Sequence, residues 1–248
     1  MEVEPPSGEE VKKVKGLKNI KNMKSDVEII PAIIPKSLKD LEANLERTKS
    51  LVKKVQIDIL DGRYDDNISW PYENKFVDFD DFEEQKKGLS FWQDFDFEFD
   101  LMIKNPEMEA DKFLNAGVDT LIYHFESTEA LGDCIEKTRL FGVKVGLALK
   151  PSTPLEKIFP YLGKVDFVQF MGNDNVGEHN VVLDERVYEK IKDLHSNYPE
   201  CIIGVDIGVN FDTAPKLIKA GATRLVSGSA IFESPNIKLA IKRLKGDA

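Results

Sequence analysis

The sequence predicts a (β/α)8 barrel, an α/β fold in which eight parallel strands alternate with helices. Three observations support this prediction. Short β-branched runs recur from Glu28 onward, amphipathic stretches with helix start signals separate them, and several of these stretches end at a glycine just before the next run. Strands that are apolar on both faces are typical of a parallel sheet covered by helices. The length of 248 residues, 42% of them hydrophobic, is also usual for one such barrel.

Eight strands are expected from runs of β-branched and aromatic residues. They begin near Glu28, Lys54, Phe97, Val118, Val143, Val165, Cys201 and Thr223. Glycines at the ends of four intervening helices support these boundaries, because glycine adopts the left-handed conformation that closes a helix. These glycines are Gly117, Gly142, Gly163 and Gly221.

The helices between the strands have recognisable first turns. Ser37 and Asp40 form a capping box, while Asn105 and Thr153 each precede a proline that suits a first turn. Ser127 is expected to cap a fourth helix. These signals place a helix after the first, third, fourth and fifth strands.

Composition favours a small-molecule partner over nucleic acid or a membrane. A formal net charge of −10 and a pI near 5.0 argue against binding to a nucleic-acid backbone. The two cysteines, Cys134 and Cys201, lie in apolar segments, which argues against a disulfide framework and fits a reducing compartment. No apolar run approaches the roughly 20 residues that cross a bilayer, and the acidic N-terminus is unlike a secretory signal. Cytoplasmic residence is therefore expected.

Two segments differ from the rest of the chain. Residues 1–26, with a proline pair and six lysines interleaved with apolar residues, are expected to form a charged tail, either solvated or docked on an acidic surface. Residues 27–248 are expected to form the barrel. Within them, residues 70–95 alternate between aromatic and acidic side chains. We expect this segment to pack on a neighbouring subunit of a homo-oligomer, or else to cover the barrel mouth.

Acidic side chains recur where the predicted strands end. Gln56 and Asp58 share one face of the otherwise apolar run at 55–60, Asp100 and Asp206 end similar runs, and His124 ends another. In a barrel these carboxyl ends line one mouth, where the chemistry of such folds takes place. Three carboxylates without a lysine or arginine among them cannot all stay ionised in a partly dehydrated mouth. They are therefore expected to share protons at raised pKa values or to hold a cation.

Several motifs resemble the ribulose-phosphate 3-epimerase family. The runs QIDILDG at 56–62 and DLMIKNPE at 100–107 carry most of the resemblance. Further segments agree in the same order, namely YHFE at 123–126, KVGLALKP at 144–151, VD with GVN at 205–210, and SGSAIF at 227–232. The resemblance covers residues 29–244 and implies the same barrel fold.

The resemblance also implies a reaction and a set of site residues. The reaction is epimerisation of a pentulose phosphate at C3, through an enediolate, and Asp58 and Asp206 match the two aspartates that transfer protons on opposite faces. His124 matches a supporting position. A divalent metal that stabilises the enediolate is implied as well. Contacts to substrate or phosphate are implied for Met102, Met171, Gly177, Gly208, Ser227, Gly228 and Ser229.

The chain departs from the family pattern at the implied metal site. Gln56 and Asp100 stand where the family has histidines. A site formed by Asp58, Asp100, Asp206 and the Gln56 carbonyl would be all-oxygen, which suits Mg²⁺ or Mn²⁺ better than Zn²⁺ or Fe²⁺. The alternative is that the metal site has been lost.

The residues expected to bind phosphate also depart from the family pattern. The family's glycine-rich loop is represented by residues 171–180, which contain two acids, Asp174 and Glu178. These acids are expected to disfavour phosphate unless they point away or help to bind a cation. Ile207 replaces a glycine, and Ala32 replaces a serine of the family near the substrate. Two alternatives to the implied epimerase therefore stay open. One is an epimerase or isomerase for a different sugar or sugar phosphate, and the other is a non-catalytic ligand-binding barrel.

Overall fold

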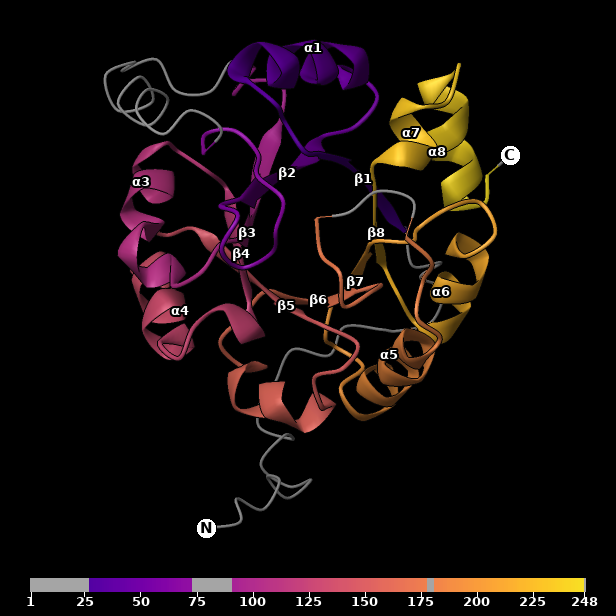
Figure 1. Cartoon of the computed structure of the whole chain (residues 1–248). Coiled ribbons are helices and arrows are strands. Elements are labelled where there is room, and N and C mark those ends of the chain that lie inside the picture. The colour runs from indigo at the N-terminus through magenta and orange to yellow at the C-terminus, as the bar shows by residue number, and fades with distance from the viewer. Residues whose placement is uncertain (1–26, 73–90, 178–180, 248) are drawn as a thin grey trace.

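The computed structural model describes residues 27–72, 91–177 and 181–247. Its strands form a closed parallel barrel in chain order, in which each strand pairs with the next and the last pairs back to the first. The helices surround the barrel (Figure 1). The predicted fold class is confirmed. The predicted tail at 1–26 and most of the segment at 70–95 lie outside the described residues.

The eight strands begin within two residues of their predicted starts. They are β1 (Glu28–Ile33), β2 (Lys54–Leu60), β3 (Asp96–Met102), β4 (Thr120–His124), β5 (Lys144–Leu149), β6 (Phe167–Met171), β7 (Ile203–Asp206) and β8 (Arg224–Ser227). The helices are α1 (Leu38–Thr48), α3 (Ala110–Asn115), α4 (Leu131–Leu140), α5 (Arg186–Asn197), α6 (Ala214–Ala220), α7 (Ser229–Phe232) and α8 (Ile237–Lys245). Short 3₁₀ helices are η2 (Pro106–Met108), η3 (Phe125–Ser127) and η4 (Leu155–Tyr161).

Side chains alternate between the barrel wall and its lumen, as the strand period requires. On β2, Val55, Ile57 and Ile59 belong to the large core between strands and helices. Leu60 instead joins a separate lumen cluster, which also contains Met102, Ile122, Ala148, Phe167, Met171 and Val176. Polar residues inside the lumen are therefore surrounded by apolar neighbours.

The helix start signals were partly right. Ser37 caps α1, because its hydroxyl accepts a hydrogen bond from the Asp40 N–H at 3.1 Å. The prolines after Asn105 and Thr153 lead into 3₁₀ helices, and the Asn105 side chain makes no capping bond. The prediction for Ser127 was wrong. Ser127 ends η3 and bonds back to the His124 carbonyl, whereas α4 begins four residues later.

Three of the four predicted glycine turns are confirmed. Gly117, Gly142 and Gly221 have φ values of 81°, 77° and 121°, which L side chains rarely adopt. Gly163 does not adopt a positive φ. At that position a compact 3₁₀ segment, η4, stands in place of the predicted α-helix and ends without a left-handed residue.

A buried ion pair closes the lumen at the amino ends of the strands. The Arg224 guanidinium on β8 donates to Glu98 on β3 at 2.5 Å and to Glu28 on β1 at 3.3 Å. The central carbon of the Arg224 guanidinium lies 3.9 Å from the centroid of the Phe167 ring. Arg224 and Glu98 are both buried. The foot of the barrel is thus a compensated charge cluster, distinct from the acids at the mouth.

No helix in the described ranges combines the length and the apolar character that crossing a membrane requires.

Candidate functional site

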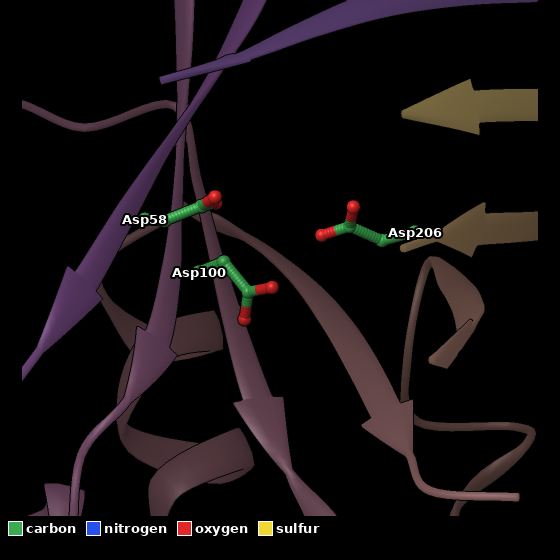
Figure 2. Close-up of side chains that lie close together, drawn as sticks. All are labelled: Asp58, Asp100 and Asp206. Atoms are coloured by element: carbon green, nitrogen blue, oxygen red, sulfur yellow. The ribbon is translucent and has the colours of Figure 1, made fainter. Parts of the chain in front are cut away.

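Three aspartates from three strands meet at the mouth end of the lumen. Asp58 and Asp100 are register neighbours on β2 and β3, and Asp206 ends β7 across the lumen. One carboxylate oxygen from each lies within 4.8 Å of the others (Figure 2). Asp100 is fully buried, while Asp58 and Asp206 keep 5% and 7% of their surface exposed. The structure therefore brings together the three acids singled out from the sequence.

Gln56 lies between the acids and uses its amide nitrogen to contact them. This nitrogen donates to Asp58 and to Asp206 at 2.8 Å each, and lies 3.5 Å from Asp100. The Gln56 carbonyl oxygen, expected as a metal ligand, accepts a hydrogen bond from Gln169 at 3.1 Å. In this arrangement the amide supplies the partial positive charge between the carboxylates. Cation binding by the carbonyl oxygen requires the amide group to turn over.

Gln169 on β6 is a member of the cluster that sequence analysis missed. Its nitrogen donates to the Gln56 oxygen and, at 3.2 Å, to Asp100. The side chain is fully buried, and its own carbonyl oxygen has no hydrogen-bond partner in the structure. A glutamine within the apolar strand Phe167–Met171 was the available signal, and it is the same signal that drew attention to Gln56.

His124 is the last residue of β4 and connects Asp100 to the loop after β2. Its Nε2 lies 2.8 Å from an oxygen of Asp100, and its Nδ1 lies 3.4 Å from the hydroxyl of Tyr64. The Tyr64 hydroxyl donates to Glu126 at 3.2 Å. Burial, followed by the charge of Glu126, raises the pKa of Tyr64, so that it stays protonated. This chain of contacts ties Asp100 to the loops that follow β2 and β4.

The two aspartates that line the mouth, Asp58 and Asp206, have raised pKa values. Burial, followed by the charges of Asp206 and Asp100, raises the pKa of Asp58 well above its usual value of 3.8. Burial and the charge of Asp100 raise the pKa of Asp206 to about 7. In the part of the chain that the structure describes, no lysine or arginine bonds to any of the three. The cluster therefore shares protons near neutral pH or takes up a cation.

The donor set fits a hard divalent cation. Three carboxylates within 4.8 Å of one another supply charged oxygen ligands, and Gln56 and Gln169 add two amide oxygens close by. Such all-oxygen sets suit Mg²⁺ or Mn²⁺. The unpartnered Gln169 oxygen shows that the amides have an unused acceptor at this position.

A cavity of about 400 Å³ opens above Asp58 and Asp206, which both line it. Asp100, Gln56 and His124 are fully buried and are not among the residues that line it. The residues expected to contact substrate or phosphate also line this cavity, namely Met102, Met171, Gly177, Gly208, Ser227, Gly228 and Ser229. The structure thus gathers the predicted substrate residues around the two aspartates that were expected to transfer protons.

Ile207 forms part of the wall of this cavity. It follows Asp206 directly and has a φ of 71°, which is unusual for a β-branched residue. Its N–H donates to the Asp206 carboxylate at 2.7 Å, and its side chain packs against the lumen cluster and lines the cavity. A side chain at Gly172 would place its Cβ 1.9 Å from the Ile207 carbonyl oxygen. The turn after β7 is therefore tightly held, and the strained backbone at Ile207 lies directly beside Asp206.

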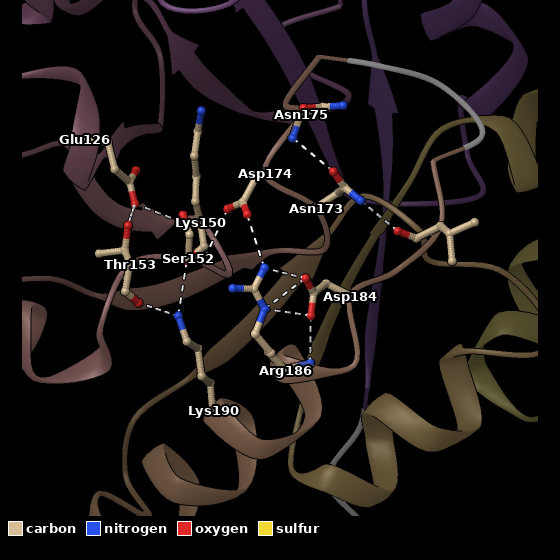
Figure 3. A network of polar contacts seen from close by, with 11 residues as sticks. Glu126, Lys150, Ser152, Thr153, Asn173, Asp174, Asn175, Asp184, Arg186 and Lys190 are labelled. Carbon is tan, nitrogen blue, oxygen red and sulfur yellow. Dashed lines mark hydrogen bonds and ion pairs between the residues drawn. The ribbon is translucent and has the colours of Figure 1, made fainter.

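A polar network joins the loops at the mouth to α5 (Figure 3). One oxygen of Glu126 accepts hydrogen bonds from the Lys150 N–H, at 2.9 Å, and from the Thr153 hydroxyl. The Lys190 ammonium on α5 donates to the backbone oxygens of Lys150 and Thr153. These contacts tie the loop after β5 both to the loop after β4 and to α5.

Asp174, one of the two acids expected to disfavour phosphate, belongs to this network. Arg186 pairs with Asp184 at 2.6 Å and with Asp174 at 3.2 Å, and Asp174 accepts from the Ser152 N–H at 3.0 Å. Burial acts to raise the pKa of Asp174, but the Ser152 hydrogen bond and the Arg186 charge outweigh it and lower the pKa. Asp174 is absent from the cavity wall. Glu178, the second acid, lies outside the described residues.

Comparisons with known proteins agree with this geometry. Residues 28–232 match the model of the family described as "Ribulose-phosphate 3 epimerase family". The chain is 32% identical over 237 residues to the chloroplastic ribulose-5-phosphate-3-epimerase of Arabidopsis thaliana, covering 90% of this chain and 77% of that protein. It is 35% identical over 152 residues to the ribulose-phosphate 3-epimerase of Bacillus subtilis, covering 59% of this chain and 69% of that protein. The match to the Schizosaccharomyces pombe enzyme, 32% identical over 149 residues, covers 60% of this chain and 65% of that protein.

Solved structures share the fold at lower identity. The 3-hexulose-6-phosphate synthase of Salmonella typhimurium superposes with a TM-score of 0.66 at 12% identity, covering 89% of this chain and 97% of that one. The 3-keto-L-gulonate-6-phosphate decarboxylase of Vibrio cholerae superposes with a TM-score of 0.64 at 11% identity, covering 89% of this chain and 97% of that one. At this identity the likeness concerns the barrel alone.

Proposed function

Because the chain belongs to the ribulose-phosphate 3-epimerase family, we propose that it is an epimerase that inverts C3 of a pentulose phosphate by proton transfer through an enediolate. The observation that carries this proposal is the position of two acids. Of the three clustered aspartates, only Asp58 and Asp206 line the cavity, and they approach it from opposite sides of the lumen. Inversion at one carbon needs an acid and a base on opposite faces of a planar intermediate.

The protonation of the two aspartates supports their roles. One must be ionised to remove the C3 proton while the other holds a proton to return. With pKa values raised by burial and by mutual repulsion, and that of Asp206 at about 7, the pair holds both forms near neutral pH. Gln56 bonds to both carboxylates at 2.8 Å and so fixes them in place. When the direction of the reaction reverses, the two aspartates exchange roles.

Substrate binding is assigned to the rest of the cavity. Ser229 and Gly228 stand where α7 begins, and the Ser227 hydroxyl donates to the Val209 oxygen, which holds this turn beside the loop after β7. Lys216 on α6 also lines the cavity and offers a positive charge to a phosphate group. Asp58, Asp100, Asp206 and the Gln56 carbonyl are the residues that would hold a divalent cation. When bound, the cation supplies positive charge that stabilises the enediolate oxygens.

A second candidate is epimerisation of a different sugar phosphate. Ile207 and Ala32 both line the cavity, and the isoleucine narrows it beside Asp206. Sugars of other length or substitution would then fit better than ribulose 5-phosphate. A non-catalytic barrel is the third possibility.

Solvent deuterium exchange tests the proposal. Ribulose 5-phosphate is incubated in D₂O with protein stripped of metal, and then with Mg²⁺, Mn²⁺, Zn²⁺ or Fe²⁺ restored. The sugar is read by NMR after chelation of the metal. We expect deuterium at C3, together with formation of the C3 epimer. If folded protein gives no exchange under any of these conditions, the epimerase assignment for this substrate is wrong. Binding without exchange would favour the non-catalytic barrel.

A further inference from the structure

The two buried glutamines form one hydrogen-bonded unit. The Gln56 nitrogen donates to Asp58 and Asp206, and the Gln169 nitrogen donates to the Gln56 oxygen and to Asp100. An amide nitrogen carries two hydrogens, so all four are used. Both amides direct their nitrogen toward the acids and act together as a neutral substitute for positive charge.

This arrangement leaves one group unsatisfied. The Gln169 carbonyl oxygen is buried without a hydrogen-bond partner in the described structure, although its residue is fully enclosed. Buried polar groups almost always find a partner, and each exception needs a physical reason. Turning Gln169 alone would bring its oxygen against the oxygens of Gln56 and Asp100, so no single rotation satisfies it.

Turning both amides together gives this oxygen a donor, and the Gln169 NH₂ group takes the place that the oxygen held. A cation among the three carboxylates repels the Gln56 nitrogen and attracts its oxygen, which requires the Gln56 amide to turn. The Gln56 nitrogen then faces Gln169, where two NH₂ groups cannot meet. If Gln169 turns as well, its unpartnered oxygen accepts from Gln56. In this exchange Asp100 loses one donor and meets the Gln169 oxygen in the position where the nitrogen now lies 3.2 Å away, a repulsion that the bound cation offsets. Asp100 keeps its contact with His124 at 2.8 Å.

We propose that Gln169 is a positioning residue that sets the orientation of Gln56, so that the two side-chain amides turn over together when a divalent cation binds the three aspartates. Gln169 acts through Gln56 and touches neither the cavity nor the reacting carbon. The inference rests on the proposed function only in assigning a cation to this cluster. Its test uses no substrate, so its failure is distinguishable from failure of the epimerase proposal.

Side-chain NMR observes the two amides directly. The chain has four glutamines, Gln56, Gln85, Gln93 and Gln169, so selective ¹⁵N labelling gives four NH₂ groups. Substitution of Gln56 or Gln169 assigns the two buried ones, and the exposed Gln93 serves as an internal control. On titration of metal-free protein with Mg²⁺, we expect the Gln56 and Gln169 signals to move with one midpoint while Gln93 stays fixed. Cation binding that leaves the Gln169 signals unchanged would overturn the proposal, as would absence of any cation binding.

Two variants separate positioning from packing. Gln169→Met keeps the length of the side chain but cannot hydrogen-bond, and Gln169→Glu keeps an oxygen that accepts from the turned Gln56. In calorimetric titrations with Mn²⁺, we expect Gln169→Met to weaken binding by about 10- to 100-fold, as loss of a residue that orients a ligand does. Gln169→Glu is expected to bind at least as tightly as the natural chain. Equal affinity in all three proteins would show that Gln169 only fills space. If a variant fails to fold, the NMR titration of the natural chain still decides.

Discussion

At the scale of single residues, the three aspartates divide into two exposed to the cavity and one held beneath it. Asp58 and Asp206 line the cavity, whereas Asp100 is enclosed by Gln56, Gln169 and His124. Under the proposed function, substitutions at the first two are therefore expected to affect proton transfer. Substitution at Asp100 affects the pKa values and the cation affinity of the other two.

Asp58→Asn and Asp206→Asn should each abolish epimerisation while leaving the barrel folded. Proton transfer by a positioned group contributes about 10²- to 10⁴-fold, so a loss of at least that size is expected in kcat. Deuterium exchange at C3 measures it, and circular dichroism checks the fold. Full exchange in either variant would rule out the two-aspartate mechanism.

The raised pKa values make cation-free protein less stable as pH rises. The carboxyl of Asp206 has a pKa of about 7 when folded, against 3.8 for an ordinary aspartate, so the folded state binds the proton more tightly. The stability that this proton contributes is complete below about pH 4 and is lost as pH rises toward 7. The slope is at most about 1.4 kcal/mol per pH unit for one group.

Urea unfolding with a chelator, between pH 5 and pH 8, measures this dependence. Asp206→Asn cannot lose a proton, so its stability should fall less over the same range and should exceed that of the natural chain at pH 8. Parallel curves for the two proteins would contradict the assigned pKa of Asp206.

At the scale of elements, the mouth is held together by side chains that bond to the backbone of neighbouring loops. Lys190 on α5 donates to two carbonyls of the loop after β5 and is half-buried. Glu126, which follows β4, accepts from the same loop. These contacts keep the cavity wall in place where little regular structure supports it.

Lys190→Met should lower the free energy of unfolding by about 1–3 kcal/mol, because two carbonyls lose a charged donor. Lys192→Met is the matched control, since Lys192 lies on the same helix but is exposed. The control should change stability by less than about 0.5 kcal/mol. Equal effects of the two substitutions, measured by urea unfolding, would show that the mouth network contributes nothing to stability.

Sequence analysis located most elements and part of the site, and the reasons for its misses are physical. Strand starts follow from local composition, and acids at strand ends stand out because burying a charge is costly. Gln169 was missed because its significance depends on Gln56 and Asp100, which lie far away in the sequence. The pairing of Asp174 with Arg186 could not be predicted for the same reason, since it depends on how a loop meets α5.

At the scale of the whole molecule, the barrel separates stability from chemistry along its axis. Arg224 and Glu98 lie at the foot and bring β8 and β3 together, and Glu28 on β1 extends the pair. The acids and the cavity lie at the opposite end. Substitutions at the foot should therefore change stability without changing the catalytic pKa values.

Arg224→Met should destabilise the fold by about 3–5 kcal/mol, because it leaves Glu98 charged and buried without its main partner. Replacing Glu98 with methionine in the same protein removes that charge, so the double variant should recover part of the loss. Urea unfolding of the single and double variants gives the coupling energy. If the stability lost in the double variant equals the sum of the losses in the Arg224→Met and Glu98→Met single variants, the pair is not coupled.

Charges are paired at the foot of the barrel but not at its mouth, and this difference bears on the order in which a cation and a substrate bind. The arginine at the foot is paired with carboxylates, whereas among the described residues the side chains bonded to the three aspartates at the mouth are two neutral amides and one histidine. A phosphorylated sugar carries negative charge and meets repulsion there until protons or a cation have neutralised the aspartates. Under the proposed function, we therefore expect protons or a cation to bind the aspartates first and the sugar phosphate to bind second.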